Sequence, residues 1–167
     1  MLEPARASNC LSPITEPHWR GKEGIDFVGP DAMREPLGTV VRLMTLSDLH
    51  KRWTVSDLDR LIMPPMETGQ CLFAIKEVAP IAFVSWALFS EEVSMIFANR
   101  MRPLRKGDWH SGDQLWIVDF IGPFGFVPEI VRMLKEYLKQ RYPRNARAFA
   151  IRYKERGRVR RLSRWTR

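Results

Sequence analysis

The chain has 167 residues, of which 45% are hydrophobic and 28% charged, a balance that indicates a globular protein with a substantial core and excludes global disorder. No uninterrupted apolar run approaches the length that spans a bilayer, and the N-terminus has no apolar signal core, so we expect neither a transmembrane segment nor export. Two cysteines are too few for a disulfide framework, so the expected location is the reducing cytoplasm.

The net charge of +8 is concentrated at the C-terminus. Residues 152–167 hold eight Lys or Arg and one acid, a net of +7, which leaves +1 for the preceding 151 residues. Such a basic segment is typical of a protein that binds an acidic or polyanionic partner. The simpler interpretation is a solvated chain end that only aids solubility. Tyr153 and Trp165 lie among its arginines, so a nucleic-acid-binding module is the alternative function, which the near neutrality of the remaining chain opposes.

The residue patterns predict one α/β domain with a mixed, mainly antiparallel sheet flanked by helices. Residues 1–35 are rich in Pro, Gly and charge and are expected to be a largely irregular extension. Apolar spacing and caps predict helices at 37–49, from Thr54 to the Pro64-Pro65 pair, at 90–101 and from Val127 to Pro143. Alternation predicts strands at 69–77, 81–89, 115–121 and 146–153. The predicted domain is 36–153, followed by a basic tail at 154–167.

The strand at 115–121 contains a single acid, Asp119. Strict alternation predicts that Leu115, Ile117 and Asp119 share one face. Because burying an unpaired carboxylate is costly, Asp119 needs a donor or a cation beside it. The strand then ends in the turn Gly122 to Gly125.

His50, one of three histidines, is the best candidate partner, because histidine suits proton transfer near neutral pH. The residues alone leave two interpretations open, and spacing favours the second: a catalytic His–Asp pair, or His50 at a helix end with Asp119 bound to an amide or an arginine. Ser47 can bond a helix end or act in the site. The amides of the turn can stabilise an oxyanion or simply close a tight turn.

Four ordered motifs over residues 36–161 resemble the RTX toxin-activating lysine acyltransferases. They are Ser47, His50 and Trp53 (S-x-x-H-x-x-W), Pro80 with Ser85-Trp86-Ala87 (P-x-x-x-x-S-W-A), Asp108-Trp109, and SGDQLWIVDFIGPFG at 111–125. The chain departs from the pattern of that family at two places: His110 stands where a small polar residue is expected, and the chain has an N-terminal extension.

The resemblance implies a GNAT-like fold and the transfer of a fatty acyl group to internal lysines of an RTX-type protoxin, with His50 as general base and Asp119 orienting it. It implies acyl carrier protein as the donor, which agrees with the lack of a glycine-rich coenzyme A loop, and no bound cofactor. No metal-ligand spacing is recognised. Nucleic acid is not an expected partner under this interpretation.

The resemblance and the charges together predict two further groups of residues. The candidates for oxyanion or site support are Ser47, Gly122, Phe124 and Gly125. The expected carrier contacts are Arg102, Arg105, Lys106, Arg152, Arg156, Arg158, Arg160 and Arg161. The toxin, the modified lysines, the acyl length, the choice between direct transfer and an acyl-enzyme, and the oligomeric state, with a homodimer as one option, stay open.

Overall fold

The computed structural model describes residues 19–20, 24–142, 147–153 and 159–166, apart from the side chains of 20, 147, 151–153 and 159–166. The strands in this part of the chain are β1 (Trp19–Arg20), β2 (Ile25–Val28), β3 (Cys71–Lys76), β4 (Ala79–Phe89), β5 (Gln114–Ile121), β6 (Arg147–Tyr153) and β7 (Val159–Thr166). The helices are α1 (Pro36–Thr45), α2 (Val55–Leu61), α3 (Met63–Glu67), α4 (Glu91–Ala98) and α5 (Val127–Arg141), with short 3₁₀ helices η1 (Pro30–Ala32), η2 (His50–Arg52) and η3 (Lys106–Trp109).

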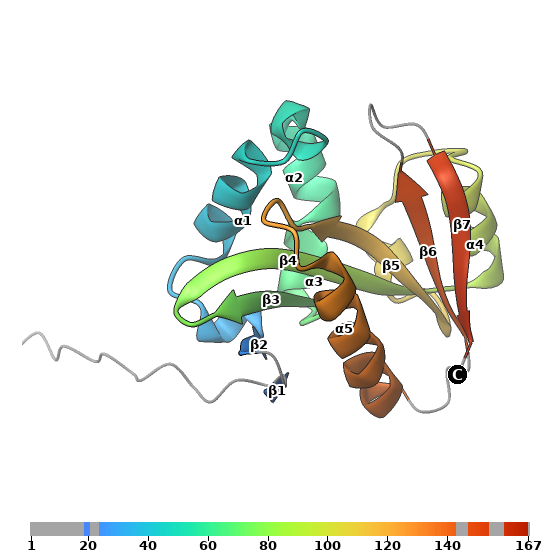
Figure 1. Ribbon diagram of the computed structural model, residues 1–167. Helices are drawn as coiled ribbons and strands as arrows, with labels where there is room; N and C mark the ends of the chain where they lie inside the picture. Colours follow the sequence, from blue (N-terminus) through green and yellow to red (C-terminus); the bar gives the residue numbers. More distant parts are fainter. Residues whose placement is uncertain (1–18, 21–23, 143–146, 154–158, 167) are drawn as a thin grey trace, which may run out of the picture.

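The strands form one mixed sheet in which they follow one another in chain order (Figure 1). Neighbouring strands run antiparallel except for β5 and β6, which are parallel because α5 carries the chain back across the sheet between them. The predicted class, a single α/β domain with a mainly antiparallel sheet flanked by helices, is confirmed.

The central strand β4 is buried on both faces. Val84 and Trp86 pack in the cluster that contains Ile130 and Leu134 of α5, whereas Phe83 packs with α1. Because successive residues of a strand point to opposite faces, α5 covers one face of the sheet and α1 covers the other (Figure 1). The predicted apolar stripe of α5 is buried at its centre, while Val127 in its first turn is 41% exposed.

Two terminal segments differ from the prediction. Residues 25–28, expected in an irregular extension, form β2, which pairs with β3 and buries Ile25 and Phe27. Residues 159–166, expected in a tail, form β7, which pairs with β6 along its length. Short or highly charged strands show little alternation of apolar and polar residues. They are stabilised mainly by backbone pairing with a neighbouring strand, which the sequence of the segment does not reveal.

The proline pair also differs from the prediction, because Pro64 and Pro65 lie in the first turn of α3 and do not end a helix. Amides in a first helical turn have no intrahelical acceptor, so proline costs little there. Thr54 caps α2 as predicted. Its hydroxyl accepts from the amide of Asp57, and the Asp57 carboxylate accepts from the amide of Thr54.

Candidate active site

The segment after α1 folds into a tight turn that holds Ser47 against His50. The amides of His50 and Lys51 both donate to the Ser47 carbonyl, at 3.1 and 2.9 Å. The turn leads directly into η2 and places Ser47 Oγ 2.7 Å from His50 Nδ1. The serine and the histidine are three residues apart in the chain, and one turn of backbone brings their side chains together.

Trp53 holds the imidazole from another side. Its ring lies edge-on to the ring of His50, with 4.9 Å between the ring centroids, and its amide donates to the His50 carbonyl at 2.9 Å. His50 is only 2% exposed. The S-x-x-H-x-x-W pattern thus describes a histidine that is packed by the tryptophan and hydrogen-bonded by the serine.

Asp119 completes a hydrogen-bonded row with these residues. Its Oδ1 lies 3.0 Å from His50 Nε2, although the two residues are 69 positions apart in the chain. An ionised carboxylate only accepts hydrogen bonds, so Nε2 carries the proton, and Nδ1 accepts from the Ser47 hydroxyl. Asp119 is 9% exposed, and its second oxygen, Oδ2, has no partner in the described part of the chain. The structure thus brings the two sequence candidates into direct contact.

A bulge in β5 decides which face of the sheet Asp119 occupies. The pairing of β4 with β5 shifts by one residue: Trp86 pairs with Ile117 and Ser85 with Asp119, which leaves Val118 as the extra residue. Ile117 packs on the α5 side, whereas Asp119 faces the side covered by α1. The predicted sharing of one face by Ile117 and Asp119 is therefore wrong, because the bulge breaks the alternation.

The turn after β5 has a backbone shape that favours glycine. Gly125 has a φ of +85°, in the left-handed region. A Cβ at Gly122 would lie 2.6 Å from the ring of Phe120, so a side chain there would force that ring to move. Phe124 and Gly125 are exposed just before α5. Their backbone amides lie at the N-terminus of a helix, a position that favours negative charge.

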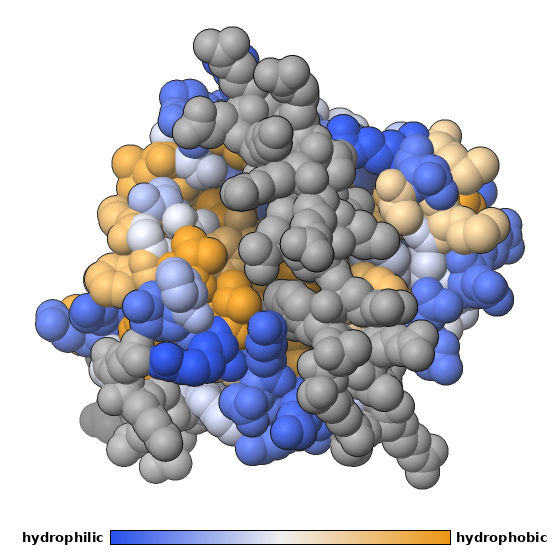
Figure 2. Space-filling model, turned by 45° about the vertical axis from the view of Figure 1, so that its right-hand side comes forward, coloured by the Kyte–Doolittle hydropathy of each residue, from blue (hydrophilic) through white to orange (hydrophobic). Residues whose placement is uncertain are grey.

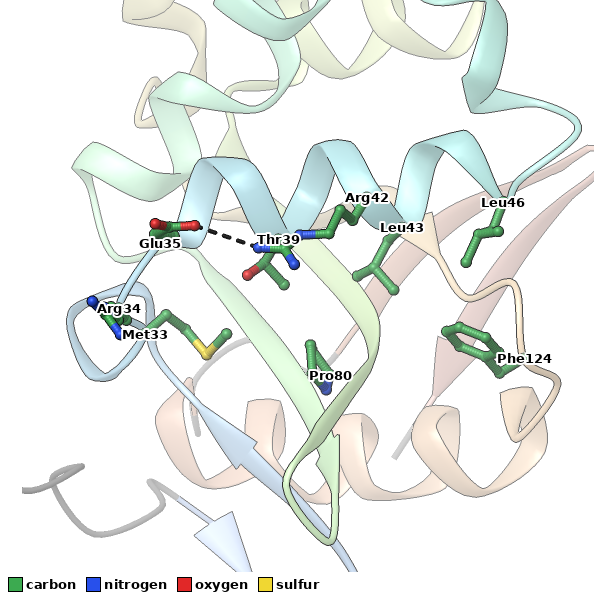
Figure 3. Close-up of a pocket in the computed structure, with 9 residues that line it drawn as sticks. All are labelled: Met33, Arg34, Glu35, Thr39, Arg42, Leu43, Leu46, Pro80 and Phe124. Atoms are coloured by element: carbon green, nitrogen blue, oxygen red, sulfur yellow. Dashed lines mark hydrogen bonds and ion pairs between the residues drawn. The ribbon is translucent and has the colours of Figure 1, made fainter.

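A groove of about 630 Å³ runs along α1 (Figure 3). Leu43 of α1 and Leu46, which directly follows the last residue of that helix, form one wall, and Pro80 and Phe124 lie across from them. Leu46 is 59% and Phe124 50% exposed, so this end of the groove presents apolar surface. Leu46 directly precedes Ser47 in the chain, and Phe124 lies in the turn that follows β5. The residues that line the rest of the groove are Met33, Arg34, Glu35, Thr39 and Arg42.

The groove was not foreseen from the sequence, because the apolar spacing of α1 shows only which residues face the core. Other residues of the matching motifs have structural partners. Trp86 is fully buried and donates from Nε1 to the Tyr142 hydroxyl at 2.9 Å. The carbonyl of Trp109, also buried, accepts from the Gln70 side chain at 3.2 Å.

The predicted carrier contacts near η3 are mostly engaged within the protein. Arg102 makes two bonds to the Asp108 carboxylate, at 2.6 and 3.0 Å, which raise the pKa of Arg102 and lower that of Asp108. Lys106 pairs with Glu67 at 2.5 Å, and this bond raises the pKa of Lys106. Arg105 is exposed.

The remaining predicted carrier contacts lie near the C-terminus. Arg156 and Arg158 lie outside the described residues, and only the backbone is described for Arg152, Arg160 and Arg161. Figure 2 brings forward the right-hand side of Figure 1 and shows hydrophilic and apolar residues interspersed on its coloured surface.

Over residues 19–20, 24–142, 147–153 and 159–166, no helix is both long and apolar enough to cross a membrane. Within the same ranges, no three His, Cys, Asp or Glu side chains gather into a group that could hold a metal ion.

Comparison with known proteins identifies the class to which this site belongs. The model of the RTX toxin acyltransferase family matches residues 30–166, so the chain belongs to that family. It is 37% identical over 89 residues to the protein-lysine myristoyltransferase RtxC of Kingella kingae, an alignment that covers 53% of each chain. It is 34% identical over 107 residues to the RTX-II toxin-activating lysine-acyltransferase ApxIIC of Actinobacillus pleuropneumoniae, covering 64% of each.

A third relative is the lysine-acyltransferase RtxC of Vibrio cholerae, with 34% identity over 104 residues, 62% of this chain and 68% of that protein. The alignments with the first two relatives span about half to two thirds of their length.

Proposed function

We propose that the protein is a lysine acyltransferase that moves a fatty acyl group from acyl carrier protein to internal lysines of an RTX-type protoxin and so activates it. The observation that carries this proposal is the hydrogen-bonded row Ser47–His50–Asp119 in a chain of the RTX toxin acyltransferase family. The names of the relatives describe lysine acylation and, for the Kingella protein, myristoyl transfer, and we propose lysine acylation for the present chain as well.

His50 is the general base of the proposed reaction. Its Nε2–H donates to Asp119, so Nδ1 is the ring atom that receives a proton. Because His50 is buried and Ser47 covers Nδ1, the lysine proton reaches the imidazole through the Ser47 hydroxyl. Asp119 holds the imidazole tautomer and stabilises the imidazolium as it forms.

The neutral lysine amine attacks the thioester carbonyl and forms the new C–N bond. The tetrahedral oxyanion then collapses, the C–S bond breaks, and the leaving thiolate takes up the proton held by His50. The amides of Phe124 and Gly125 are proposed oxyanion donors, supported by the exposure of both residues before α5 and by the place of Phe124 in the lining of the groove. Gly122 gives the turn the space that it needs beside Phe120. The groove of Figure 3 is the proposed path by which the reacting groups reach Ser47.

The decisive experiment compares two histidines. Co-expression of His50→Ala with a protoxin is expected to yield no acylated lysine by mass spectrometry. The matched control is His110→Ala, which removes an exposed histidine and is expected to acylate normally. Near-normal acylation by a His50→Ala protein with a native circular dichroism spectrum would exclude this assignment.

The route of transfer is tested on the enzyme itself. Direct transfer predicts that incubation with the acylated carrier alone leaves the intact mass of the enzyme unchanged. An added acyl mass that is absent from Ser47→Ala would instead establish an acyl-enzyme on Ser47.

The basic residues are proposed to bind the acidic carrier, and Arg105 is the exposed member near η3. Because 159–166 is a strand of the sheet, the test neutralises Arg160 and Arg161 to glutamine and does not truncate the chain. Calorimetry is expected to show weaker carrier binding and a flatter salt dependence. The control neutralises the exposed Lys139 and Arg141 at the end of α5 and is expected to bind normally. Unchanged affinity and salt dependence in the first variant would remove these arginines from the carrier site.

The nucleic-acid alternative is not favoured, because the family match extends to residue 166 and so includes most of the basic segment on which that alternative depended.

A further inference from the structure

Ser85, the serine of the P-x-x-x-x-S-W-A match, has no role in the reaction described so far. It lies in β4, is fully buried, and pairs directly with Asp119 of β5. Residues directly opposite each other in an antiparallel pair point to the same face, with Cβ atoms about 4.5–5.5 Å apart. The Ser85 hydroxyl therefore lies beside the Asp119 carboxylate on the α1 side of the sheet.

Each of these two side chains has a buried oxygen without a hydrogen-bond partner in the described part of the chain. They are Ser85 Oγ and Asp119 Oδ2. The carboxylate only accepts, and a hydroxyl is a rotating donor, so the two groups are complementary. Serine has three staggered χ1 positions, so the hydroxyl can turn toward Oδ2 without a shift of the strand.

Cys71 is a second polarisable neighbour that the strand pairing places beside Ser85. Cys71 of β3 pairs with it from the opposite side and is 1% exposed. Burial raises the pKa of the Cys71 thiol to about 12, so it stays neutral, and neutral sulfur is a weak acceptor. The carboxylate is the stronger acceptor for the Ser85 hydroxyl.

We propose that Ser85 is a positioning residue whose hydroxyl donates to Asp119 Oδ2 and holds the carboxylate with Oδ1 toward His50 Nε2. This role rests on the proposed function. With a hydrogen bond at Oδ1 alone among the described residues, the carboxylate can turn about its terminal torsion, which is broad for aspartate. A second donor on the other oxygen restricts that rotation and supports the negative charge opposite the imidazole.

The kinetic test compares Ser85→Ala with Ser94→Ala. Ser94 is also a buried serine, 5% exposed, and its hydroxyl accepts a hydrogen bond from Trp116 Nε1 at 2.9 Å. Ser94→Ala therefore removes a buried hydrogen bond that lies outside the proposed site. We expect Ser85→Ala to lower kcat roughly ten- to hundredfold, the effect of one hydrogen bond to a charged group, with KM unchanged for both substrates. Ser94→Ala is expected to keep the wild-type kcat.

A double-mutant cycle links the effect to Asp119. In the Asp119→Asn background, Ser85→Ala is expected to cause no further loss, because the carboxylate that it positions is already absent. Wild-type kcat in Ser85→Ala, or the same fold loss in both backgrounds, would overturn the proposal. Imidazole nitrogen spectra give a second readout, in which Ser85→Ala, and not Ser94→Ala, raises the fraction of His50 protonated at Nδ1. An unchanged fraction would count against the positioning role.

A crystal structure of the wild-type protein tests the contact independently of activity. The distance between Ser85 Oγ and Asp119 Oδ2 is expected to be roughly 2.5–3.0 Å. A Ser85 hydroxyl bonded to any other group would overturn the proposal even if Ser85→Ala failed to fold. Activity retained by His50→Ala would refute the proposed function instead, while this contact could still be found.

Discussion

Replacing Asp119 with asparagine is expected to separate activity from stability. The carboxylate is 9% exposed, accepts one hydrogen bond from His50 at 3.0 Å, and has a second oxygen without a partner among the described residues. An amide of the same shape carries no charge, and its NH₂ group can donate to the Ser85 hydroxyl. The substitution therefore keeps the shape of the site and removes a buried charge.

Two contributions of opposite sign determine how much the free energy of unfolding changes. Replacing a buried charge with a neutral amide removes part of its desolvation cost, which stabilises the fold by about 1–3 kcal/mol. Exchanging a charge-assisted bond to His50 for a neutral one costs about 1 kcal/mol. The free energy of unfolding is therefore expected to rise by roughly 0–2 kcal/mol, and Tm by roughly 0–8 °C at this chain length. Acyl transfer is expected to fall by about 10³- to 10⁴-fold, because an amide cannot stabilise imidazolium.

Thermal unfolding followed by circular dichroism and initial rates of protoxin acylation, both at pH 8, measure the two effects. The matched control is Asp59→Asn, which replaces an exposed aspartate in α2 and should change neither quantity. A Tm that falls by more than about 5 °C would show that the charge of Asp119 is needed for folding. Full activity of the asparagine variant would refute its role beside His50.

Three further substitutions test the fold around the site. Asp108→Asn weakens the bonds to Arg102, and a loss of about 1–3 kcal/mol is expected at neutral pH. Because the pKa of Asp108 is lowered from 3.8, this stabilisation is present above that pH and is lost as the pH falls through the lower folded-state value, so urea melts of the two proteins should converge in acid. Gly112→Ala would place a Cβ 2.6 Å from backbone beside the start of α4, and thermal melts should show a loss of about 1–3 kcal/mol or more; an unchanged Tm would contradict this clash. Thr54→Ala removes the side-chain cap of α2 and should cost about 0.5–2 kcal/mol in denaturant melts; an unchanged midpoint would show that the Thr54 hydroxyl does not stabilise the helix.

The sequence alone was enough to select the groups of the candidate site and most of the elements that carry them. Asp119 stands out as an acid in an apolar strand, and the one-turn spacing of Ser47 and His50 is a local pattern that the structure turns into a hydrogen bond. The stripe of α5 and the cap of α2 are local in the same way, since the neighbours that make them lie three or four residues apart.

Only the tertiary structure decided that His50 and Asp119 touch, since 69 residues separate them. Strict alternation put Asp119 on the face of Ile117, and the bulge at Val118 moved it to the opposite face. The register between β4 and β5 is a property of two strands paired together, and no pattern within either strand encodes it. The strand β2 and the groove beside α1 were hidden for the same physical reason, because each exists only where segments distant in the chain pack against one another.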